Sequence, residues 1–330
     1  MDLLLSVPIL SALFTPTWTT SMNILFFYGT WSTLVLTTKP YVIHAESLVV
    51  IRAIFWLLPS ALFLLLDVGV PSIAGSLKYA GKAGLPPPTR KTARAAGLAV
   101  LNCVLVTAVE SAASYVFVRA FGKPLFRTPT MLPLPWQVFK HVCLLLTVRE
   151  VLTYYIHRDV LHGRRAGRLL SDLHRSHAHS TPASALQLYA DHPLPLLTLH
   201  LAGTFLPAAL LRPHLLTYML FVLLTTIEST FSHSGYSFVP GVFLAGIARR
   251  NAVHYATRGG ANYGAWGVLD WAHGTSAGGS VLQDARDEAG KHNLQERAGG
   301  KIDDGMSAVS EGVEGLRRSS RKRSTPKKSD

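Results

Sequence analysis

The sequence predicts an all-α membrane protein, in which apolar helices cross a bilayer and a histidine-rich stretch follows one of them. Only 15% of the residues are charged, well below the roughly 25% of soluble domains. Several apolar runs also approach the roughly 20 residues that cross a hydrocarbon core. Buried helices of a large soluble domain would give similar runs, but less often together with so few charges. The runs span residues 24–38, 47–66, 96–118, 136–156, 194–211 and 215–231.

The first run is short, and the N-terminus before it is also apolar. The stretch MDLLLSVPILSALF has Asp2 where a secretory signal peptide has Lys or Arg. We therefore expect a retained membrane-associated segment rather than a cleaved signal. Runs 96–118 and 136–156 are expected to form one membrane hairpin, and runs 194–211 and 215–231 a second.

Basic residues predict the orientation in the membrane. With this hairpin arrangement, the three basic stretches emerge on one face, and cytosolic loops carry the excess of Lys and Arg. We therefore expect the histidine-rich stretches and the C-terminus to be cytosolic. The basic stretches lie within residues 78–94, 158–175 and 249–258.

Composition divides the chain into three parts. Residues 1–94 hold the N-terminal membrane segments and a basic loop, residues 95–275 hold the histidines, and residues 276–330 have the composition of a disordered tail. The basic end of this tail is expected to meet anionic lipid rather than nucleic acid. Lys327 and Lys328 resemble a dilysine retrieval signal, which predicts residence in the endoplasmic reticulum.

The cysteines restrict the kind of metal site. Cys103 and Cys143 both lie inside apolar runs, so no disulfide framework or CxxC metal site is available. Any bound metal must therefore have nitrogen or oxygen ligands.

Histidines cluster directly after an apolar run. Five of the 14 histidines fall within 23 residues, and neutral imidazole is a good ligand for iron and other transition metals. On an α-helix, His174 and His177 lie about 60° apart, whereas His157 and His162 lie about 140° apart. The second pair therefore suits a site that several helices surround. The five are His157, His162, His174, His177 and His179, and His233 and His254 follow.

The histidine motifs resemble those of the fatty acid hydroxylase and sterol desaturase superfamily of membrane-bound di-iron oxygenases. The resemblance covers Glu150 to Thr275, in the motifs YYIHRDVLH, LHRSH, HSGY, NYG and WAHGT. It implies a four-helix membrane anchor below a cytosolic cap whose histidines bind two iron ions. It also implies that O2 and electrons from cytochrome b5 and its reductase are used to hydroxylate or desaturate a lipid.

Three positions depart from the family pattern. Ala178 stands where the second cluster has a histidine, and His179 is the nearest substitute. Arg250 and Val253 stand at ligand positions of the third cluster, and arginine cannot bind a metal. We therefore expect two irons, the second weakly held and the activity correspondingly impaired. The expected ligands are His157, His162, His174, His177, His179, His233 and His254.

The remaining candidate residues are expected to be structural. Asp270 is expected to have no ligand role, and His192 to mark the start of a membrane run. Ordinary packing or interface roles are expected for His44, His141, His200 and His214.

The sequence therefore predicts an oxidoreductase: a membrane-bound, iron- and O2-dependent hydroxylase of a fatty acyl chain or sterol-like lipid, in lipid or secondary-metabolite biosynthesis. One alternative is a sterol desaturase or C4-methyl oxidase, which the motif HSGY favours. Another is an impaired family member that binds lipid or acts as a membrane scaffold. No catalytic side chain beyond the metal ligands is expected.

Overall fold

The computed structural model describes residues 18–87, 89–163, 168–179, 182–239, 242–279 and 286. Contacts divide the chain into one compact unit, Met1–Val281, and a second, Leu282–Asp330. The description below concerns the first unit. Nearly all of the predicted tail, with Lys327 and Lys328, lies outside the described residues.

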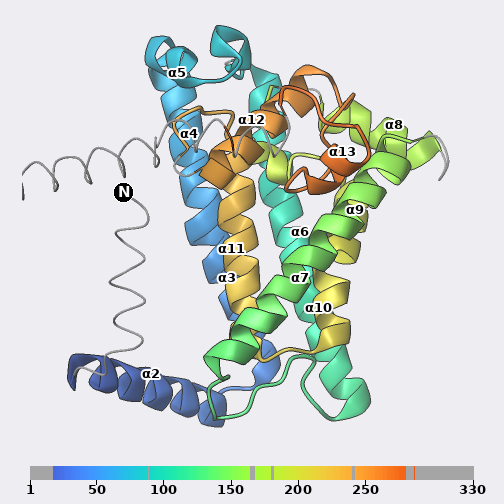
Figure 1. Cartoon of the computed structure of the whole chain (residues 1–330). Helices are drawn as coiled ribbons and strands as arrows, with labels where there is room; N and C mark the ends of the chain where they lie inside the picture. Colours follow the sequence, from blue (N-terminus) through green and yellow to red (C-terminus); the bar gives the residue numbers. More distant parts are fainter. Residues whose placement is uncertain are drawn as a thin grey trace, which may run out of the picture. The chain divides into compact units, whose positions relative to one another are not determined.

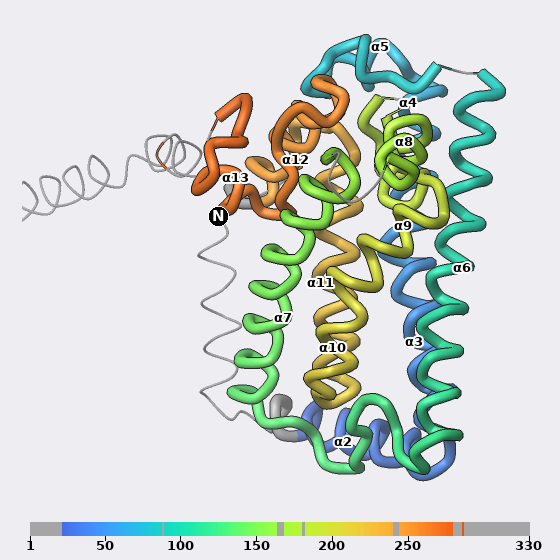
Figure 2. Tube along the Cα trace, turned by 90° about the vertical axis from the view of Figure 1, so that its right-hand side faces the viewer, coloured from blue at the N-terminus to red at the C-terminus, as the bar shows by residue number. Residues whose placement is uncertain are grey.

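The regular secondary structure of the described residues is entirely helical, without a β-strand, which confirms the predicted class. Four helices are long and apolar enough to cross a membrane, and they lie side by side in both views (Figures 1 and 2). Two of these spans are composite, with α3 and α4 in the first and α9 and α10 in the third. The spans are Pro40–Gly69, Arg90–Phe121 (α6), Pro193–Leu211 and Leu215–His233 (α11).

The other two apolar runs are helical but are not among these four. Helix α2, Trp18–Thr37, runs across one end of the spanning helices (Figure 1). Helix α7, Pro135–Tyr155, lies beside α11 and contains Lys140, Arg149 and Glu150, which lower its hydropathy. Only the four more apolar runs therefore meet the requirement for a span.

Proline causes a local change of helix type in each composite span. Helix α3, Pro40–Arg52, continues through a π-helical turn, Ala53–Leu57, into α4, Leu58–Gly69. Helix α9, Pro193–His200, continues through a second π-helical turn, Leu201–Phe205, into α10, Leu206–Leu211. Pro59 and Pro207 follow these turns. A proline lacks an N–H and crowds the carbonyl four residues earlier, and the wider turn accommodates it.

The spanning helices differ in burial. In the most apolar window of each helix, 61% of the residues are buried in α11 but only 28% in each of the other three spans. Helix α11 therefore lies innermost, and side chains such as Leu62, Leu101 and Val104 remain exposed on the outer helices. Apolar side chains exposed along a span are suited to contact with lipid.

The shorter helices gather at one end of the spans and form a cap. Figure 1 shows α5, α8, α12 and α13 at the end opposite α2. The cap therefore joins segments that are far apart in the sequence. Its helices and turns are α5 (Pro71–Leu77), a 3-10 turn (Gly81–Gly84), α8 (Arg168–His177), a 3-10 turn (Ala185–Leu188), α12 (Val242–Ala256) and α13 (Val268–Ala272).

The predicted orientation can be tested with glycosylation acceptor sites. We expect an acceptor sequence inserted after Thr275, in the cap, to remain unmodified, because the basic loops predict that the cap faces the cytosol. An acceptor inserted beside the exposed Lys123, at the other end of α6, should be glycosylated. A gel shift after glycosidase treatment measures both, and modification after Thr275 would contradict the orientation.

Candidate metal centre

A π-helical turn brings His157 and His162 together. The turn spans Ile156–Leu161, and the amide of His162 donates to the carbonyl of His157 at 2.9 Å. This i→i+5 hydrogen bond places residues five apart nearly above one another, rather than the 140° apart expected for an α-helix. The two ring centroids are consequently 4.9 Å apart.

The end of α8 supplies two further histidines. His174 lies within the helix and is buried, whereas His179 follows the last helical residue, His177. In the turn after the helix the chain leaves the helical path, so the ring of His179 turns back to 5.3 Å from that of His174 and 5.1 Å from that of His162. The buried Ala178 beside it has no ligand atom.

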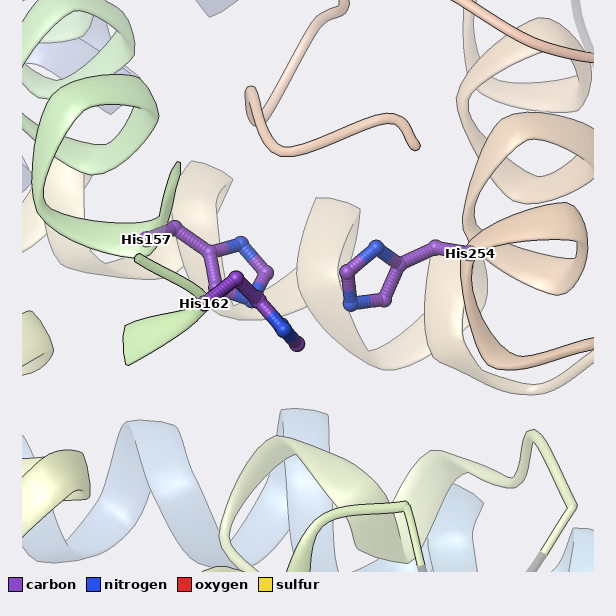
Figure 3. Close-up of side chains that lie close together, drawn as sticks. All are labelled: His157, His162 and His254. Atoms are coloured by element: carbon purple, nitrogen blue, oxygen red, sulfur yellow. The ribbon is translucent and has the colours of Figure 1, made fainter. Parts of the chain in front are cut away.

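His254 completes a group of five histidines from the opposite side. It projects from α12 toward His157 and His162, as Figure 3 shows. In each of two three-histidine groups, the possible ligand nitrogens lie within 4.8 Å of one another, and His162 belongs to both. We call the five residues the histidine pentad: His157, His162, His174, His179 and His254.

Hydrogen bonds orient three rings of the pentad for metal binding. The Nδ1–H of His157 donates to the Tyr263 carbonyl at 2.9 Å, and that of His254 donates to the Ala261 carbonyl at 2.7 Å. The Nδ1–H of His174 donates to Asp191 at 2.6 Å. Because carbonyl and carboxylate oxygens only accept, Nδ1 holds the proton and Nε2 keeps its lone pair.

Several ring nitrogens of the pentad lack a protein partner. The buried Nε2 of His174 and the buried Nδ1 atoms of His162 and His179 have no hydrogen bond. Buried polar atoms without a partner are costly, and a metal ion would satisfy them. The donor set therefore fits a transition metal that accepts nitrogen ligands.

Burial keeps the pentad uncharged. Desolvation and then the repulsion of neighbouring histidines lower the pKa of His157 and of His179 to about 3. Burial also lowers the pKa of His174 to about 4, and the pKa values of His162 and His254 are lowered by burial and by nearby histidines. The imidazoles are therefore neutral at pH 7, which is the form that binds metals.

A loop after α12 supplies the carbonyl acceptors of the pentad. The fully buried Asp270 accepts from the amides of Tyr263 and Gly264 at 2.8 and 2.7 Å, and from the Thr275 hydroxyl at 2.7 Å. Asn262, which has a φ of +60°, donates to the Arg250 carbonyl at 2.9 Å. Asp270 thus fixes the loop that holds His157. It does not belong to either three-histidine group of the described residues.

Asp191 is a supporting residue that the sequence analysis missed. Its buried carboxylate binds His174 and also accepts from the amide of His192 at 2.6 Å. Carboxylates that hold a metal-binding histidine in this way fix its tautomer and orientation. Its position just before an apolar run resembles an ordinary helix cap, so nothing in the sequence distinguishes it.

Two predicted ligands lie outside the pentad. The ring of His177 lies 5.2 Å from that of His192, and its Nδ1 bonds to the Leu173 carbonyl. His233, at the end of α11, bonds through Nδ1 to the Ser229 carbonyl at 2.7 Å. It lines the same cavity as the pentad, but neither residue belongs to a three-histidine group among the described residues.

Arg250 stands at a ligand position of the family pattern. It is buried, and its Nη2 donates to the Trp266 carbonyl at 2.8 Å. Its side chain also lines the cavity. A guanidinium here contributes a positive charge and no lone pair for a metal.

A cavity of about 180 Å³ extends from the pentad among the membrane helices. His157, His174, His179 and His254 line one part of it. His200, expected from the sequence to be an ordinary packing residue, also lines it and bonds to Glu110 at 2.6 Å. The cavity therefore joins the pentad to a polar group inside the spans. Its apolar lining includes Leu188, Leu196, Leu199 and Ile247.

Comparison with known proteins identifies related sequences. The fatty acid hydroxylase family model matches residues 142–275. A very-long-chain aldehyde decarbonylase of Oryza sativa subsp. indica is 29% identical over 202 residues, which cover 58% of this chain and 74% of the relative. Methylsterol monooxygenase 2-2 of Arabidopsis thaliana is 30% identical over 176 residues, covering 50% and 62% respectively. No solved structure matches this chain significantly.

The role of Asp191 can be tested by removing its charge. In Asp191→Asn the hydrogen bond to His174 loses its carboxylate acceptor, and we expect metal affinity to fall about 10- to 100-fold. Competition with a chelator, followed by metal analysis of the purified protein, measures the change. Asp172→Asn, at an exposed position on α8, is the matched control, and equal retention by both variants would contradict this role.

The contact of Asn262 with the following segment predicts where the chain can be shortened. Ala277 exchanges two hydrogen bonds with the Asn262 side chain, at 2.9 and 3.0 Å. We expect a chain ending at Gly279 to retain its metal, and one ending at Thr275 to retain less because the loop loses this anchor. Metal content and melting temperature of the two truncated proteins would be compared. Identical values would show that the anchor is dispensable.

Proposed function

Because the chain belongs to the fatty acid hydroxylase and sterol desaturase superfamily, we propose that it is a membrane-bound hydroxylase that uses iron and O2 to oxidise a lipid. A fatty acyl chain or a sterol-like molecule is the substrate class. One observation carries the proposal: five neutral, largely buried histidines converge, and four of them line a cavity among the membrane helices. The relatives' names, which refer to very-long-chain aldehydes and methylsterols, support a lipid substrate.

The pentad is the proposed iron ligand set. Bound iron supplies oxidising power that no amino-acid side chain has. The Tyr263 and Ala261 carbonyls and Asp191 hold three of the rings by Nδ1, so that Nε2 remains for the metal. We propose that the pentad holds one iron firmly. Because His177 and His233 lie outside both groups and Arg250 lines the cavity, a second iron would be held weakly.

The cavity would bind the substrate, and the surface of the cap would receive the electrons. Leucine side chains such as Leu196 and Leu199 bind an apolar chain and exclude water from the oxidised carbon. Electrons would come from cytochrome b5 and its reductase on the cytosolic face of the endoplasmic reticulum. Exposed basic residues of the cap, such as Arg168, are suited to an acidic partner.

Two alternatives have specific support. A sterol desaturase or C4-methyl oxidase would use the same scaffold, and the similarity to a methylsterol monooxygenase favours the methyl oxidase. An impaired relative that only binds lipid would explain Arg250 at a ligand position. Product mass and metal content separate these alternatives from the hydroxylase.

The proposed reaction can be tested by lipid analysis of cells that express the protein. We expect the wild-type chain to produce lipids heavier by one oxygen atom, and His157→Ala or His174→Ala to reduce this product at least 100-fold because the iron site is incomplete. His141→Ala, on α7 away from the cavity, should leave the product unchanged. A product lighter by two hydrogen atoms would indicate desaturation instead.

Metal content tests the pentad independently of turnover. We expect detergent-purified protein to retain about one iron per chain after dialysis and up to two when excess iron is present. His254→Ala should lower the retained iron, whereas His141→Ala should not. Protein that binds no metal but still binds lipid would favour the impaired relative.

A further inference from the structure

A buried polar network joins the four membrane spans, and Tyr218 on α11 donates to Glu110 at 3.4 Å. Nη2 of Arg52, on α3, lies 3.0 Å from each carboxylate oxygen of Glu110, on α6. His200, on α9, bonds through Nε2 to the same carboxylate at 2.6 Å. The side chains of Arg52 and Glu110 are only 2% and 1% exposed. Ionisable residues inside membrane spans are costly and commonly functional, which makes the network a candidate for a role beyond packing.

The network fixes the direction of the hydrogen bond that His200 makes. Arg52 and Glu110 balance each other, and Arg52 also donates to the Thr107 hydroxyl at 2.7 Å. A protonated His200 would add an uncompensated positive charge inside the membrane, which is unfavourable. Nε2 of His200 lies 2.6 Å from the Glu110 carboxylate and 3.3 Å from Nη2 of Arg52. Because the carboxylate only accepts hydrogen bonds and is the closer partner, Nε2 of a neutral His200 carries the proton. Its Nδ1 is then an acceptor with a free lone pair.

His200 belongs to the wall of the cavity. The side chain of His200 is 21% exposed and lines the same cavity as His174 and His254. No residue described in the structure donates to its Nδ1. His200 lies seven residues after Pro193, so it is about 10 Å along the helix from the cap end of the span. A molecule that reaches it from the pentad extends into the membrane.

We infer that His200 is a specificity-determining residue that accepts a hydrogen bond from the hydroxyl group of a lipid alcohol. The pentad lies at another part of the same cavity. The inference rests on the proposed function and narrows its substrate class. A sterol or a long-chain alcohol can donate a proton to Nδ1. An aldehyde, an ester or an ether has only acceptor oxygens, and it would leave this position unpaired.

Binding of matched probe pairs tests the inference without turnover. Cholesterol and its methyl ether form one pair, and hexacosanol and its methyl ether form the other. Each would compete with a fluorescent sterol for the purified full-length protein in nanodiscs. We expect the wild-type protein to prefer at least one alcohol over its ether about 10-fold, the value of one hydrogen bond. The pair that shows the preference identifies the sterol or the acyl class.

Variants of His200 assign the preference to this residue. His200→Phe should bind an alcohol and its ether equally, because it keeps the bulk and loses the acceptor. His200→Gln should retain a preference, since its amide can donate to Glu110 and its carbonyl can accept from the hydroxyl. His141→Phe should behave as the wild-type protein. A purely structural role would weaken both members of a pair alike and preserve their ratio.

The outcomes separate this inference from the proposed function. Equal binding of alcohols and ethers by the wild-type protein, or a preference that persists in His200→Phe, would overturn the inference. Failure of the hydroxylase proposal would instead appear as absent metal or absent product, which are measured on the same preparations. An alcohol preference that depends on His200 in metal-free protein would support a lipid-alcohol binding protein.

Discussion

The candidate centre depends on one backbone hydrogen bond, from the amide of His162 to the carbonyl of His157. This bond closes a π-helical turn at the end of α7 and thereby places two imidazoles on one side of the chain. His162 belongs to both three-histidine groups, so the other histidines of the pentad gather around the residue that the turn positions. An uninterrupted α-helix would direct His162 away from His157, and neither group would form.

Buried polar groups explain much of the surrounding architecture. Three rings of the pentad need acceptors for Nδ1–H, and two carbonyls and a carboxylate supply them. The loop that offers these carbonyls needs support in turn, which the buried Asp270 and Asn262 provide. Asp270 and Asn262 thus hold the loop, and the carbonyls of the loop hold the histidine rings. The same requirement holds in the membrane, where Glu110 is satisfied by Arg52 and His200.

The fold was predictable to the extent that it depends on local composition. Spans such as 96–118 and 215–231 follow from apolar length alone, since a bilayer requires about 20 apolar residues. The run 136–156 forms helix α7, but charged residues such as Arg149 and Glu150 keep it out of the four most apolar spans. Apolar length therefore predicted the helix but not its exclusion from the four spans, which depends on its charged residues.

The sequence by itself determined the chemistry of this protein: a membrane setting, and a cluster of histidines that follows an apolar helix. Composition and residue type are local properties, so both can be identified without coordinates. Only the tertiary structure decided which imidazoles meet. It joined His179 and His254 to the centre, left His177 beside His192, and placed Asp191 and His200 at the cavity. These choices depend on where helices end and how distant segments pack, which spacing along the chain does not specify.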